Sequence, residues 1–215
     1  MKRSFLPALL SLATLSLIGC ANVEVTKTYV ASGAHHPSSI YIRPFNVAGA
    51  TFVGDHGPLG ERPIRQALAP AELGIALKEQ LSKIAPTMVI DNNDIPEEGW
   101  IVDGNIDVVD GGNQALRFFF GRLGAGRTTA IVHVRVTRAG EEGGESDGKG
   151  GAPEGVLYAF DVKSSSKAAG PTGSVYNSGM GSSEMFDYRN IAEEVGKVLT
   201  PDPYKYGVRD GGADR

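Results

Sequence analysis

The stretch that most constrains the fold runs from Gly104 to Arg138, where two alternating apolar and polar runs flank a connector rich in glycine and phenylalanine. Because successive side chains of a strand point to opposite faces, alternation of this kind predicts a strand with one buried face. The first strand is expected at Trp100–Asp110 and the second at Arg127–Arg138. Their core-facing residues are predicted to be Val102, Ile106, Val108, Val132, Val134 and Val136.

The remaining periodic segments predict three more strands and two helices. The strands are Ser39–Val47, Thr87–Ile90 and Val156–Ser164, and the amphipathic helices are Ala71–Ile84 and Ser183–Thr200. The order is then β-α-β-β-β-β-α. Each helix carries one apolar stripe, so both can cover the same face of a sheet. We therefore predict an α/β protein of the α+β type, with a mixed, mostly antiparallel sheet and two helices packed on one face.

The N-terminus is predicted to be a secretory signal. Residues 1–19 have a basic start followed by an apolar run that is too short to cross a bilayer. Leu17–Cys20 resembles the bacterial lipobox, and Cys20 is the sole cysteine among 215 residues. The resemblance implies cleavage between Gly19 and Cys20, and attachment of S-diacylglycerol and an N-acyl chain (such as palmitate) to Cys20. The alternative is an ordinary signal peptide followed by an incidental cysteine.

The predicted anchor and the composition together define the domain organisation. We expect a lipidated flexible tether at 20–38, a single domain at 39–200 with a disordered acidic glycine loop at 139–155, and a polar tail at 201–215. An Asp directly after the lipidated cysteine is associated with retention in the inner membrane. Here that residue is Ala21, so we expect the protein in the outer membrane, facing the periplasm, and not in the inner membrane. The net charge of −4 argues against a nucleic-acid partner.

The connector resembles a phosphate-binding loop by spacing alone. Gly121, Gly126 and Thr128 stand in the required places, but Arg127 replaces the lysine. A phosphate loop also needs a helix after it, whereas the residues after Arg127 predict a strand. We therefore expect no nucleotide, and interpret Gly121, Gly124 and Gly126 as structural glycines that shape a turn or bulge.

Three consecutive aromatic residues, Phe118, Phe119 and Phe120, lie between Arg117 and Arg122. Because three neighbours cannot all face one core, these five residues form a candidate contact surface for a membrane interface or an oligomer. The alternative is a short turn that buries two of the rings while the arginine head groups reach the solvent.

The same region carries a family resemblance. Its pattern is Gly104-x-Ile106, Gly112-Asn113-x-Ala115-Leu116-Arg117, Gly121 and Gly124-Ala125-Gly126-Arg127 before the valine-rich strand. This pattern resembles the bacterial lipoprotein family catalogued as domain of unknown function 4410. The resemblance implies a fold and a location in the cell envelope, and it implies no activity.

No catalytic motif is present. Asp103, Asp107 and His133 could share the polar face of the sheet, as a metal or acid–base site or as ordinary solvated residues. We predict no catalytic residue, no metal and no cofactor. The predicted function is a non-enzymatic, lipid-anchored envelope protein that contacts another envelope protein or further copies of itself. The alternative is a periplasmic module that binds a small ligand or glycan on the polar sheet face.

Overall fold

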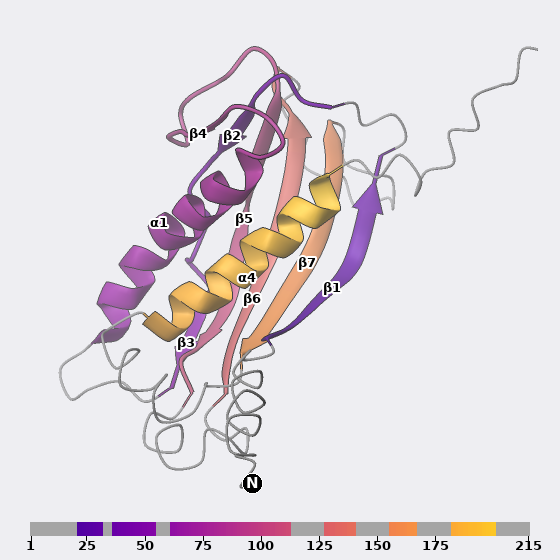
Figure 1. Ribbon diagram of the computed structural model, residues 1–215. Coiled ribbons are helices and arrows are strands. Elements are labelled where there is room, and N and C mark those ends of the chain that lie inside the picture. Colours follow the sequence, from indigo (N-terminus) through magenta and orange to yellow (C-terminus); the bar gives the residue numbers. More distant parts are fainter. Residues whose placement is uncertain are drawn as a thin grey trace, which may run out of the picture.

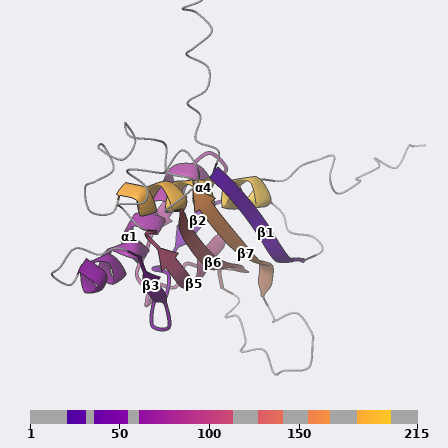
Figure 2. The same ribbon diagram turned by 90° about the horizontal axis from the view of Figure 1, so that it is seen from below.

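A seven-stranded sheet covered on one face by two helices forms the domain (Figures 1 and 2). The computed structural model describes residues 21–31, 36–54, 61–112, 127–140, 155–166 and 182–200. The elements are β1 (Ala21–Val30), β2 (Ile40–Ile42), β3 (Thr51–Val53), α1 (Glu61–Leu81), β4 (Thr87–Val89), β5 (Trp100–Asp110), β6 (Thr128–Arg138), β7 (Val156–Ser166) and α4 (Ser182–Leu199).

The strands are arranged in the order β1-β7-β6-β5-β2-β4, with β3 also paired to β5. The four long strands β1, β7, β6 and β5 pair antiparallel, whereas the short strands β2, β3 and β4 make only parallel pairs. The predicted α+β class and the mixed, mostly antiparallel sheet are confirmed. Strands β2 and β3 follow the same edge of β5, joined by a bridge between Asn46 and Asn105.

The core lies between the sheet and the two helices. Every second residue of β6 is buried, as the alternation predicts, and α1 and α4 cover these side chains with one stripe each. Full burial of an aliphatic side chain contributes about 1.5–3 kcal/mol, so this layer dominates the stability of the fold. The helix residues are Ala69, Leu73, Leu77 and Leu81 from α1 and Tyr188, Ile191, Val195 and Leu199 from α4.

Helix α1 is longer than predicted. It begins at Glu61 instead of Ala71, and Pro70 lies inside it instead of marking its start. Proline lacks the N–H that would bond to the preceding turn, and buried Ala69 continues the stripe of Leu73 toward the N-terminus of this longer helix. Among the helices that the structure describes, none is long and apolar enough to cross a membrane.

Two strands were not predicted. Residues 21–30, expected as part of a flexible tether, form the edge strand β1, with Val23 and Val25 packed against the core. Residues 51–53, expected within a long connection, form β3, whose Phe52 is buried. Both strands gain stability from pairing with β7 and β5, respectively, partners that are distant in the sequence.

Candidate functional site

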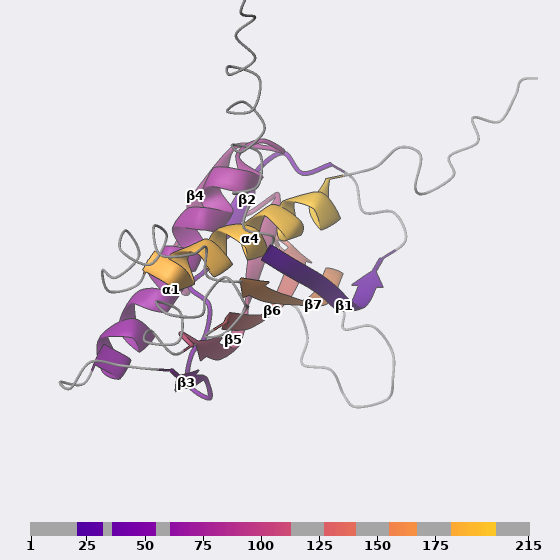
Figure 3. The same cartoon turned by 60° about the horizontal axis from the view of Figure 1, so that its bottom comes forward.

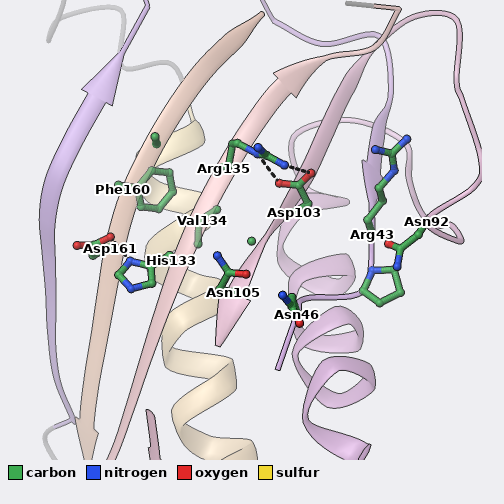
Figure 4. Close-up of a pocket in the computed structure, with 13 residues that line it drawn as sticks. Arg43, Asn46, Asn92, Asp103, Asn105, His133, Val134, Arg135, Phe160 and Asp161 are labelled. Atoms are coloured by element: carbon green, nitrogen blue, oxygen red, sulfur yellow. Dashed lines mark hydrogen bonds and ion pairs between the residues drawn. The ribbon is translucent and has the colours of Figure 1, made fainter. Parts of the chain in front are cut away.

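The face of the sheet away from the helices carries a polar groove of about 760 Å³ (Figure 4). It lies across β5, β6 and β7 and reaches the segment that follows β2. We refer to it as the groove. Its polar side chains are Arg43, Asn46, Asn92, Asp103, Asn105, His133, Arg135 and Asp161.

Asp103 and Arg135 face each other across β5 and β6 and form a two-point ion pair. Arg135 Nε donates to Asp103 Oδ1 at 2.9 Å, and Nη2 donates to Oδ2 at 3.1 Å. The hydrogen bond to Asp103, partly opposed by desolvation, raises the pKa of Arg135, which stays charged. An exposed pair of this kind contributes only up to about 1 kcal/mol, but it occupies the Asp103 carboxylate.

His133 lies between two carboxylates from neighbouring strands. Its Nδ1 meets Asp161 Oδ1, and its Nε2 is 2.5 Å from Asp107 Oδ2. Desolvation lowers the pKa of His133, but the two hydrogen bonds and the two negative charges outweigh it, so the net pKa is raised. An imidazolium can donate from both nitrogens and has no lone pair for a metal. In the part of the chain that the structure describes, no group of three or more His, Cys, Asp or Glu side chains is arranged to hold a metal ion.

Asp107 lies at a bulge in β5. Ile106 pairs with Val132 and Val108 pairs with Ile131, so Asp107 is an extra residue without a partner across the strand. A bulge of this kind redirects the side chains that follow it. It also overturns the prediction that Val108 faces the core: Val109 is buried in its place, at 1% exposure.

Gly104 lies in the groove, where β5 and β6 approach closely. A Cβ at this position would lie 1.9 Å from the carbonyl oxygen of His133 and 2.9 Å from Phe45 Cε1. Glycine is the only residue that leaves this space open. The close approach therefore depends on Gly104.

Arg43 contributes a donor at the other side of the groove. Its Nη2 donates to the carbonyl oxygen of Asp94 at 2.7 Å. Its Nε is buried and, within the described residues, has no hydrogen-bond partner. Because a buried donor without a partner costs roughly 1–3 kcal/mol, a water or ligand oxygen at this position would be stabilising.

The structure brings together only part of the predicted polar set. Asp107 and His133 do meet, whereas Asp103 pairs with Arg135. Asp161 was missed, although it stands between buried Phe160 and Val162 and so had to face outward on β7. The other predicted site residues lie outside the described residues: Gly19, Cys20, Arg117, Phe118, Phe119, Phe120, Gly121, Arg122, Gly124 and Gly126.

A second surface lies on the outer side of α1, which forms the margin of the helical layer (Figure 3). Ile64, Leu68 and Ile75 are 52%, 49% and 68% exposed. Ala71 is also exposed, and the four residues are spaced by four, three and four positions along the helix. Apolar residues with this spacing line one side of a helix that packs on another helix. We call these four residues the outer seam. It points away from the core stripe of Leu73 and was not predicted.

Comparison with known proteins gives one family and two distant structures. The family described as domain of unknown function (DUF4410) matches residues 40–170. A search of curated proteins found no match. A PelC dodecamer from Paraburkholderia phytofirmans and a variant of it align at 10% and 11% identity, each with a TM-score of 0.36, covering 82% of this chain and 98% of theirs. A similarity this distant does not extend to function.

Proposed function

We propose that this chain, which belongs to the family described as domain of unknown function (DUF4410), is a lipid-anchored envelope protein that acts by binding other proteins. The lipobox-like segment ending at Cys20 supports the anchor, and Ala21 after it supports the outer membrane, facing the periplasm. The observation that carries the binding role is the outer seam of α1.

A helix on the surface of a soluble domain is normally polar on its solvent side. Helix α1 is apolar on both sides, with Leu73 and Leu77 in the core and Ile64, Leu68 and Ile75 exposed. About half of each exposed side chain remains to be buried, and by area each would contribute roughly 1 kcal/mol. This is a modest contact in solution. Two proteins anchored in one membrane meet at a high effective concentration, which makes such a contact sufficient.

The groove supports binding over catalysis. Both ring nitrogens of His133 are engaged by carboxylates, and Asp103 is paired with Arg135, so among the described residues of the groove no general base stands beside a nucleophile. An enzyme that transfers acyl or glycosyl groups would keep its catalytic carboxylates or histidine available to contact the substrate. We therefore propose that the protein is not an enzyme.

The test compares two isoleucines of nearly equal exposure. Ile75 belongs to the outer seam, and Ile95, 70% exposed, lies outside it and serves as the matched control. Envelopes from cells that produce wild-type protein, I75E or I95E are crosslinked, and the recovered partners are quantified. We expect I75E to lose a partner that wild type and I95E retain. Recovery of the same partners with all three proteins would contradict the proposal.

A second candidate is binding of a small polar ligand or glycan in the groove, which the unsatisfied Arg43 Nε favours. A panel of neutral oligosaccharides should then raise the melting temperature of the wild-type domain. The shift should disappear in R43Q and persist in K83Q, which removes an exposed cation outside the groove. No shift with the wild-type protein would exclude neutral oligosaccharides as ligands of the groove.

A further inference from the structure

Strand β1 begins at Ala21, the residue directly after Cys20, and is paired from its first position, where Ala21 lies opposite Ser166. If Cys20 carries the lipid, as proposed above, no tether separates the sheet from the acyl chains. We propose that the end of the sheet where β1 begins rests on the headgroups of the lipid bilayer. We call this end the foot. The inference depends on the proposed lipid anchor.

The strand registers define which residues lie at the foot. Ser166 is opposite both Ala21 and Thr128, so β1, β7 and β6 reach the same level. One step further, Thr129 is opposite Asp110, and Asp110 is opposite Val53, which brings β5 and β3 to this level. Figure 1 shows these strand ends together at the lower end of the sheet.

A single attachment point allows two orientations, and the strand registers favour one. In the upright orientation, the foot faces the headgroups. Its only carboxylate among the described strand ends is Asp110, which accepts a hydrogen bond from the Gly112 N–H at 2.8 Å, and Arg127 adds an exposed cation. In the alternative, the long edge of β1 lies on the membrane and exposed Glu24 faces the lipid phosphates. Lys27 in the same strand balances Glu24, as Arg127 balances Asp110 at the foot, so the charges do not distinguish the two orientations. The registers favour the upright orientation, because they place the ends of β7, β6, β5 and β3 at the level of the anchored end of β1.

The upright orientation fixes heights above the membrane. At about 3.3 Å per residue, Val30 stands roughly 30 Å above Ala21, and His133 and Arg135 stand roughly 17 and 23 Å above Thr128. The groove then opens sideways into the periplasm. Helix α1 runs alongside the sheet (Figure 1), so its outer seam also faces sideways, where a neighbour anchored in the same leaflet would meet it.

The test measures membrane proximity at three sites. Lipidated protein is reconstituted in vesicles of phosphatidylethanolamine and phosphatidylglycerol that contain a lipid with a nitroxide on its headgroup. A fluorophore is attached to a single new cysteine, because the native Cys20 thiol is blocked by the lipid. The variants are T129C at the foot, T26C on the exposed edge of β1, and E97C at the opposite end, near Gly140.

We expect several-fold stronger quenching at T129C than at T26C or E97C. Equal quenching at T129C and E97C would overturn the inference in favour of free pivoting, and stronger quenching at T26C would overturn it in favour of the edge-on orientation. Flotation of the same vesicles separates this result from the anchor itself. Protein that fails to float refutes the lipid anchor and the foot together. Protein that floats but shows no stronger quenching at T129C than at the other two sites refutes the foot alone. The C20S protein sets the unquenched baseline.

Discussion

Replacement of Gly104 by alanine should be among the most damaging single-methyl additions in this protein. The new Cβ would lie 1.9 Å from the His133 carbonyl oxygen, whereas real Cβ atoms essentially never approach a heavy atom closer than 3.0 Å. The two strands must therefore separate by about 1 Å, against a normal spacing of about 4.8 Å. Gly104 also accepts a backbone hydrogen bond from the Asn46 N–H at 2.9 Å, so its displacement disturbs the β5 contact with the segment after β2.

The cost can be estimated from two contributions. Forcing an extra carbon into a packed site costs about 1–3 kcal/mol. Weakening the adjacent ladder hydrogen bonds costs about 0.5–1.5 kcal/mol each. We expect G104A to lower the free energy of unfolding by about 3 kcal/mol. With a urea m-value of about 2 kcal/mol/M, the midpoint should fall by about 1.5 M.

The single tryptophan, Trp100, is buried beside Tyr158 and reports unfolding by its fluorescence. The control is Gly74 in α1, where an added Cβ meets nothing within 4 Å. Because alanine favours a helix over glycine by up to about 1 kcal/mol, G74A should be neutral or stabilising. If G104A unfolds within 0.5 M urea of the wild type, the close approach of β5 and β6 is wrong.

Two further predictions concern polar contacts. The raised pKa of His133 means that its ion pairs with Asp107 and Asp161 stabilise the fold below the unfolded pKa of about 6.5 and lose this effect as pH rises through the folded pKa. Wild type should therefore exceed H133Q in melting temperature at pH 5.5 and lose that advantage by pH 8.5, and a difference that does not vary with pH would refute the ion pairs. Buried Ser164 Oγ donates to buried Asp187 Oδ1 at 2.7 Å, so S164A should cost about 1–3 kcal/mol in urea denaturation, and an unchanged midpoint would count against this contact.

Local patterns were sufficient for most of the long elements. Strands β5, β6 and β7 and helix α4 alternate or repeat strongly enough to be recognised from the sequence. Strand β1 has a weaker pattern, in which only Val23 and Val25 alternate with polar neighbours, and its stability comes from pairing with β7. The sequence does not reveal that pairing, so local patterns alone predict a tether there.

Helix α1 shows how a strong local rule can mislead. Proline is tolerated in the first turn of a helix but disfavoured in its interior. Pro70 therefore predicts that the helix starts there. Pro63 in the first turn and the run of helix-favouring residues from Gln66 to Ala69 were signals of an earlier start. A helix that starts at Pro70 also leaves out Ile64 and Leu68, which are half of the outer seam.

The groove could be predicted only in outline. The outward positions of Asp103 and His133 followed from alternation, but their partners depend on register. The bulge at Asp107 shifts the pattern by one residue, and no feature of the local sequence marks it. Partner assignment between strands therefore required the three-dimensional structure.

The central claim is that the domain is held at a membrane by lipid on Cys20. Mass spectrometry of the mature protein purified from envelopes tests it directly. We predict that the chain begins at Cys20 and that this residue carries a diacylglycerol thioether and an N-acyl chain. A mature protein that retains residues 1–19, or one that begins at another residue with an unmodified Cys20, would contradict the account.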